Sequence, residues 1–115
     1  MTWEEVKNLQ ISNIIAGSPS ELNDLVKQSL SIVGSSTLKD DEIQMLINAG
    51  ASDLIRQGID VQNNINDGLI QGAIVMYVKA NFGMVDINEK KQAWDRYIQT
   101  ITNLSLSQQY LISEE

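Results

Sequence analysis

The sequence predicts an all-α fold, a compact bundle of about five helices with a short N-terminal helix and a C-terminal tail. Apolar residues recur at three- and four-residue steps, and helix start signals or glycines bound the segments in which they do so. A chain of 115 residues with 43% hydrophobic content can bury one core. We therefore expect a helical bundle domain over residues 1–104 and a tail over residues 105–115.

The first helix begins near the N-terminus. Thr2 and Glu5 have the spacing of a capping box, in which each side chain bonds the backbone of the other end of the first turn. Trp3, Val6 and Leu9 supply a short apolar face. These residues predict a brief helix.

The second helix has a stronger start signal. Ser18 can cap the helix, Pro19 fits its first position, and Glu21 can reach back to the cap. We expect this helix to run to about Val33, with Gly34 ending it. Its apolar stripe, which we expect to face the core, comprises Leu22, Leu25, Val26, Leu30 and Val33.

The third helix is predicted to begin at a cluster of acids. Asp40, Asp41 and Glu42 suit the positive end of a helix dipole, Arg56 suits the negative end, and Gly58 is a natural stop. The residues that recur at helical spacing are Ile43, Leu46, Ile47, Gly50 and Leu54.

Gly50 is unusual because it lies inside this helix. A glycine there costs about 1 kcal/mol relative to alanine. Our hypothesis is that a neighbouring helix approaches closely at Gly50, so that a side chain would not fit.

Two further helices follow a loop. Residues 60–68 are rich in Asn and Asp, which favour turns, and residues 69–82 then form what we expect to be the most buried helix, closed by Gly83. Its apolar positions include Ile70, Ala73, Ile74, Tyr77 and Val78. In the last helix we expect Asn88 to be the cap and Glu89 to lie in the first turn. Its expected stripe is Ala93, Trp94, Tyr97, Ile98, Ile101 and Leu104.

Two apolar features admit both a structural and a functional interpretation. Trp94 and Tyr97 are interpreted as core or helix–helix contacts, with use at an interface as the alternative. The tail is also apolar, because five large apolar side chains occur within nine residues: Leu104, Leu106, Tyr110, Leu111 and Ile112. Either the tail folds back over the bundle, or it is a docking strand or helix for a partner.

Charge and composition exclude several functions. The chain has neither cysteine nor histidine, and no phosphate-loop, dinucleotide or zinc-protease motif, so we expect no enzymatic activity, cofactor or metal. A calcium loop starting at Asn63 would place Ile65 and Ile74 where oxygen ligands are needed. The net charge of −7 opposes binding to nucleic-acid phosphates. The start lacks a basic signal region and no apolar run could cross a membrane, which predicts a protein that stays in the cytoplasm.

Several segments together resemble the phage head-tail connector family. They are Asp41-Glu42-Ile43, Ala51-Ser52-Asp53-Leu54, the run from Gln71 to Gly83, and Leu104-Ser105-Leu106-Ser107 followed by Tyr110. The resemblance covers residues 40–112, whereas the first forty residues do not align and the loop from Gln62 to Gly68 is extended. It implies a structural head-tail adaptor.

This resemblance implies particular partners and a particular place. The partners are the portal protein, a stopper or tail-completion protein, and further copies in a ring of about twelve, with genomic DNA only as cargo through the channel and no membrane. The place is the virion neck, after assembly in the host bacterial cytoplasm. The family's C-terminal segment binds the portal, which carries that role onto Ser105, Leu106, Ser107, Gln108, Gln109, Tyr110, Leu111 and Ile112. The acidic charge favours an alternative, a DNA-mimic inhibitor or another small helical interaction protein.

Overall fold

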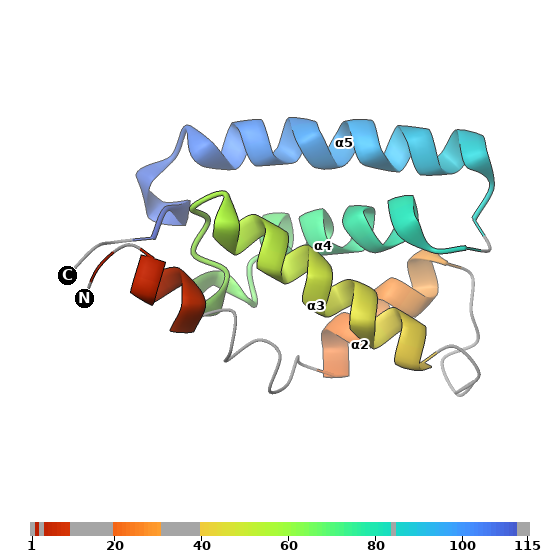
Figure 1. Ribbon diagram of the computed structural model, residues 1–115. Coiled ribbons are helices and arrows are strands. Elements are labelled where there is room, and N and C mark those ends of the chain that lie inside the picture. The colour runs from red at the N-terminus through yellow and green to blue at the C-terminus, as the bar shows by residue number, and fades with distance from the viewer. Residues whose placement is uncertain (1, 3, 10–19, 31–39, 84, 113–115) are drawn as a thin grey trace.

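The structure of the chain is a computed structural model that describes residues 2, 4–9, 20–30, 40–83 and 85–112. The described part contains a helix over residues 4–9, then α2 (Ser20–Ser29), α3 (Asp40–Arg56), η1 (Gln62–Asn64), α4 (Gly68–Asn81), α5 (Ile87–Ser105) and η2 (Gln108–Tyr110). The predicted all-α bundle is therefore confirmed. Helix α4 lies at the centre, with α5 along one side of it and α2 and α3 along the other (Figure 1).

The N-terminal helix begins as the capping spacing predicts. The Glu5 amide donates a 3.2 Å hydrogen bond to the Thr2 hydroxyl. Val6 is partly buried against the core, and the Lys7 ammonium donates to the carbonyl of Arg56 at 3.1 Å. This contact places a positive charge at the negative end of the α3 dipole and fixes the helix beside the end of α3. Trp3 lies outside the described residues.

Helix α2 presents a narrower core face than predicted. Leu22 and Val26 are buried, but Leu25 is 40% exposed, so the prediction that it faces the core was wrong. Among the described helices α2 packs mainly on α4 and α3, and Leu25 lies about 100° around the helix from Val26. The Lys27 ammonium binds the Asp40 carboxylate at 2.7 Å and so joins α2 to the start of α3. The predicted boundary residues Ser18, Pro19, Val33 and Gly34 lie outside the described residues.

Helix α3 has the predicted ends. It begins at the acidic cluster, and Gly58 follows it with a φ of 95°, a conformation in which glycine is favoured. A Cβ atom on Gly50 would lie 2.9 Å from Cδ1 of Tyr77, which is on α4. The hypothesis of a close helix approach at Gly50 is therefore confirmed.

Helices α4 and α5 are both capped by aspartate. The Leu69 amide donates to the Asp67 carboxylate at 2.8 Å, and the Asn88 amide donates to the Asp86 carboxylate at 3.0 Å. The prediction that Asn88 is the cap of the last helix was thus wrong by two residues, because Asp86 offers the same chemistry earlier and α5 begins at Ile87.

The tail folds back onto the bundle, which is the first of the two interpretations of its apolar character. The Asp60 amide donates to the Tyr110 carbonyl at 2.7 Å, and the Ile112 amide donates to the Gly58 carbonyl at 2.9 Å. Between these two bonds, Ile59 and Leu111 form an antiparallel bridge. The side chains of Tyr110 and Ile112 are buried in the same core as those of α3, α4 and α5.

Candidate docking surfaces

An aromatic cluster joins three helices. The ring of Tyr97 on α5 lies 5.3 Å from the ring of Tyr77 on α4 and 5.6 Å from that of Trp94. The Tyr97 hydroxyl donates a 2.5 Å hydrogen bond to Asp53 on α3. Burial, followed by this hydrogen bond, raises the pKa of Tyr97 far above its ordinary value. Tyr97 is thus a core residue, whereas Trp94 lies at the surface and remains 44% exposed.

Helix α5 carries an exposed apolar line that we call the α5 stripe, made of Ile87, Trp94 and Ile98. Ile87 is 78% exposed and Ile98 is 45% exposed. The prediction that Ile98 faces the core was wrong, because α5 packs mainly on α4 and the contact buries a narrower line. Trp94 is not in the core either, but it makes the predicted helix–helix contact, since its ring lies 6.4 Å from that of Tyr77 on α4. That buried line is Ala93, Tyr97, Ile101 and Leu104. Exposed aromatic and branched side chains on one helix face are typical of an interaction surface.

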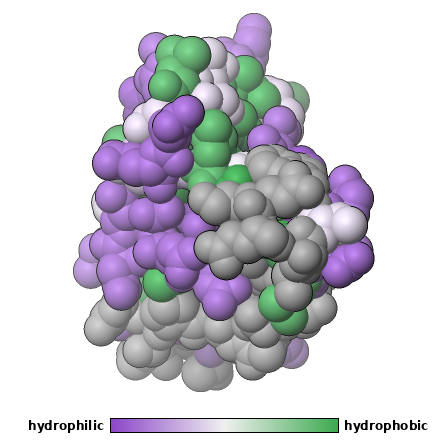
Figure 2. All heavy atoms as spheres, turned by 90° about the vertical axis from the view of Figure 1, so that its left-hand side faces the viewer, coloured by the Kyte–Doolittle hydropathy of each residue, from purple (hydrophilic) through white to green (hydrophobic). Residues whose placement is uncertain are grey.

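The predicted portal-binding residues separate into an outward and an inward group. Leu106 is 83% exposed. The exposed group is Ser105, Leu106, Gln108 and Gln109, while Ser107 and Leu111 are partly buried. The inward pair is Tyr110 and Ile112, and the Tyr110 hydroxyl donates to the Asp67 carboxylate at 3.0 Å. Figure 2 views this end of the molecule, where apolar surface appears near the top, at the level of α5.

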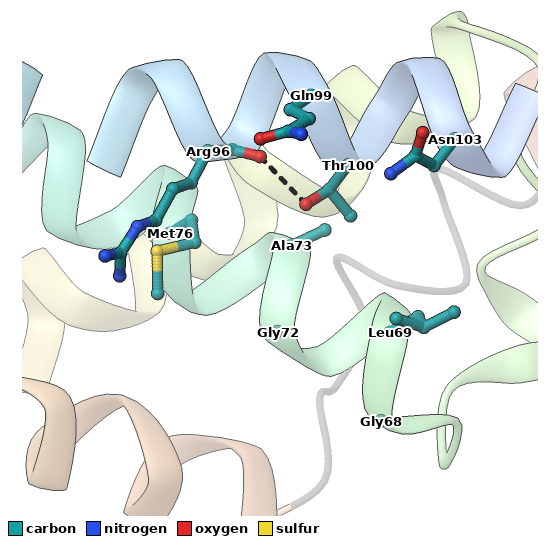
Figure 3. A pocket seen from close by; sticks show the side chains of 9 residues that line it. All are labelled: Gly68, Leu69, Gly72, Ala73, Met76, Arg96, Gln99, Thr100 and Asn103. Carbon is teal, nitrogen blue, oxygen red and sulfur yellow. Dashed lines mark hydrogen bonds between the residues drawn. The ribbon is translucent and has the colours of Figure 1, made fainter. Parts of the chain in front are cut away.

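A groove follows the seam between α4 and α5, and we call it the seam groove (Figure 3). Its main hollow is about 330 Å³ in volume. The lining residues are Gly68, Leu69, Gly72, Ala73 and Met76 from α4, and Arg96, Gln99, Thr100 and Asn103 from α5. A Cβ atom added to Gly68 or Gly72 would meet no atom within 4 Å. The groove exists because glycines leave its floor without side chains.

The seam groove continues along α5 toward the N-terminal end of that helix. A second hollow of about 80 Å³ shares Met76 and Arg96 with the first and also reaches Lys79 and Glu89. The combined surface therefore offers an apolar floor, amide and hydroxyl groups, and charges of both signs near one end. The groove was not predicted from the sequence, although Gly68 and Gly72 at helical spacing were a signal for it.

Many carboxylates of the described chain have structural roles. Asp40 pairs with Lys27, Asp53 accepts from Tyr97, and Asp67 and Asp86 cap helices. Asp60 accepts a 2.7 Å hydrogen bond from the Asn63 amide group. Carboxylates fixed in this way are not free to imitate a regular row of phosphates, which disfavours the DNA-mimic alternative.

The described residues contain no group of three or more acidic side chains placed to hold a metal ion. None of the helices in this part of the chain is both long enough and apolar enough to span a bilayer.

A small helical bundle with an apolar helix face, a partly exposed tail and a surface groove belongs to the class of structural interaction proteins. The chain is a member of the phage connector protein family, whose family model matches residues 22–110. The match runs from α2 through η2, so it includes the α5 stripe, the seam groove and most of the tail. No curated protein and no solved structure gives a significant match. The family assigns the chain a structural, connector-like role with other phage head and tail proteins as partners.

Proposed function

We propose that the chain is a head-tail adaptor of a tailed phage. It binds the portal ring after DNA packaging, forms part of the DNA exit channel, and offers a platform to a stopper or tail-completion protein. The family match over residues 22–110 carries this proposal, because it includes all the long helices and the surfaces between them. The site of action is the virion neck, and assembly takes place in the host bacterial cytoplasm.

The portal contact is made by the tail, over Ser105–Ile112. Leu106 supports this assignment because it is 83% exposed and follows directly on the end of α5. Tyr110 and Ile112 are buried beyond it, so they anchor the segment while Leu106, Gln108 and Gln109 remain available. An exposed apolar side chain followed in the chain by two exposed glutamines suits an interface with an apolar centre and a polar rim.

In the virion we propose a ring of about twelve copies, which is a closed cyclic assembly, while the isolated subunit is a monomer. Each subunit carries a net charge of −7. A ring whose acids line the bore would repel DNA phosphates and let the genome pass without sticking. A ring with a neutral or basic bore would contradict this assignment of the acids.

The experiment is co-sedimentation of the purified chain with portal rings of the same phage. The variant is Leu106→Asp, which places a charge at the centre of the proposed contact but removes no buried atom. Truncation after Asn103 is a less selective variant, because it also removes Leu104, Tyr110 and Ile112 from the core. Portal binding by the wild-type chain and its loss in Leu106→Asp are expected.

The matched control is Met45→Asp on α3, which introduces the same charge at another exposed apolar residue. This variant should bind the portal like the wild-type chain. Binding by Leu106→Asp equal to that of Met45→Asp would move the portal contact away from the tail. Absence of binding by the wild-type chain would reject the adaptor function.

A further inference from the structure

We propose that the α5 stripe of one subunit docks into the seam groove of the next copy of the same chain. This inference rests on the proposed function, in which the chain assembles into a ring, and it assigns the two surfaces that meet there. The occupant of the groove is therefore a second copy, presenting Trp94 and Ile98.

The two surfaces lie on opposite flanks of α5. At 3.6 residues per turn, Trp94 and Arg96 point about 200° apart around the helix axis. The groove side of α5 faces the seam with α4, as Figure 3 shows for Arg96 and its neighbours. A contact between two different surfaces of the same subunit is heterologous, and such contacts generate rings when the rotation closes.

The shapes and polarities of the two surfaces match. The groove floor consists of Gly68, Gly72 and Ala73, and the side chains of Leu69 and Met76 offer apolar walls. The hollow of about 330 Å³ has room for one large side chain. Trp94 and Ile98 are large apolar side chains with nearly half of their surface still exposed. In the parallel register that places Asp95 beside Arg96, Ile98 lies level with this hollow, and Trp94 lies level with the smaller hollow beside Gln92 and Ala93.

The two surfaces also carry opposite charges at similar places along α5. Beside the stripe the order is Lys91 then Asp95, and along the groove it is Glu89, with Lys79 lining the same hollow, then Arg96. Among the described residues no ion pair involves any of these side chains. With parallel α5 helices, Lys91 of one copy approaches Glu89 of the next and Asp95 approaches Arg96.

The spacing permits both pairs at once. At 1.5 Å per residue, Lys91 and Asp95 are about 6 Å apart along the helix, and Glu89 and Arg96 are about 10 Å apart. The long side chains of lysine and arginine bridge the difference of about 4 Å. Equivalent helices of neighbouring subunits run in the same sense around a ring with many subunits, so the parallel order is the one that a ring requires.

The test is disulfide trapping, which the absence of native cysteine makes clean. One variant is Thr102→Cys, on the exposed side of α5 next to the stripe, and the other is Asn103→Cys, in the groove lining. The two are mixed at high protein concentration under mild oxidation. The mixed disulfide should form about tenfold faster than either homodimer, the ratio that a modest contact preference gives.

Two further variants make the readout specific. Gly72→Leu, added to the Asn103→Cys copy, places a side chain on the groove floor, where a Cβ atom meets no other atom within 4 Å, and should remove the preference for the mixed disulfide. Arg96→Asp in that copy should weaken the preference, and Asp95→Arg in the other copy should restore it. Cross-linking that is unselective, or unchanged by Gly72→Leu, would overturn the inference.

A different occupant would also overturn it. Glu5 and Leu9, one turn apart on the N-terminal helix, are another exposed pair of a carboxylate and an apolar side chain. If Asn103→Cys forms a disulfide faster with Glu5→Cys than with Thr102→Cys, the occupant of the groove is the N-terminal helix.

The disulfide measurement is independent of portal binding. Selective trapping without portal binding would reject the adaptor function and keep the contact, whereas portal binding with unselective trapping would reject the contact alone.

Discussion

The Tyr97 hydroxyl on α5 donates a 2.5 Å hydrogen bond to the Asp53 carboxylate on α3, although α5 packs mainly on α4. The Tyr97 ring is fully buried against Tyr77. This bond therefore joins the outer helix of the bundle to the helix on the far side of α4. It also fixes the position of Trp94, whose ring lies against that of Tyr97.

We predict that Tyr97→Phe lowers the free energy of unfolding by about 1.5–3 kcal/mol, the range for a hydrogen bond to a charged group. The loss arises because the Asp53 carboxylate is left without the donor that Tyr97 supplies. Urea denaturation measures it. Tyr77→Phe is the matched control, since no described residue offers the Tyr77 hydroxyl a hydrogen-bond partner. Equal stability of the two variants would show that the bond to Asp53 contributes nothing.

Stability should also fall at alkaline pH. The pKa of Tyr97 in the folded chain is raised above the ordinary value of about 10, because burial and Asp53 both disfavour the phenolate. The stabilisation is therefore complete below about pH 10 and is lost as the pH rises above that value toward the folded pKa. Urea denaturation from about pH 8 to about pH 11 should give a steeper fall for the wild-type chain than for Tyr97→Phe. Parallel curves would contradict this assignment.

Alanine substitution should change the stability of the chain in opposite directions at two glycines, Gly50 in the core and Gly72 in the groove. Gly50→Ala places a Cβ atom 2.9 Å from Tyr77, and we expect a loss of about 1–3 kcal/mol from overpacking. Gly72→Ala meets no atom, so the higher helix propensity of alanine should stabilise the chain by up to about 1 kcal/mol. Thermal unfolding measures the stability of both variants. A stable Gly50→Ala would show that the ring of Tyr77 moves aside at little cost.

Gly50 and Gly58 could be understood from the sequence because a glycine has a specific local meaning at each position. A glycine inside a helix needs a neighbour that excludes a side chain, and a glycine after a helix suits the left-handed conformation. Both features are local enough to be visible in one sequence. The beginning and end of α3 were predictable for the same reason. Its acids and Gly58 each affect only the helix turn next to them.

The surfaces of α5 could not be predicted in the same way. Periodicity marks Trp94 and Ile98 as part of an apolar face, but only the placement of α4 decides how wide a strip of that face is covered. The seam groove depends equally on which helices flank Gly68 and Gly72. The tail was ambiguous because its apolar residues divide between inward and outward groups, which a sequence pattern does not distinguish.

The cap of α5 can be tested by substitution at two nearby residues. Asp86→Ala removes the side chain that accepts from the Asn88 amide, and it should cost about 1 kcal/mol of stability. Asn88→Ala keeps that bond, because its backbone amide remains, and should change stability by less than about 0.5 kcal/mol. Thermal unfolding measures both. A larger loss from Asn88→Ala would restore the prediction that Asn88 is the cap.

Because the tail is anchored by buried side chains and also carries exposed ones, we expect different residues to support stability and docking. Ile112 is buried, and its amide donates to the Gly58 carbonyl, so Ile112→Ala should cost about 2–5 kcal/mol. It should also increase hydrogen exchange at the Asp60 amide, which donates to the Tyr110 carbonyl and so reports detachment of the tail.

Leu106→Ala is the control for the same measurements. Its side chain is exposed, so stability should change by less than about 0.5 kcal/mol and the Asp60 amide should keep its protection. A loss of stability in Leu106→Ala equal to that in Ile112→Ala would mean that Leu106 packs on the bundle. If Ile112→Ala left the Asp60 amide protected, the tail would be held by the backbone pairing alone. If Ile112→Ala and Leu106→Ala both behave as expected, weaker portal binding by Leu106 variants would reflect a change at the interface and not in the fold.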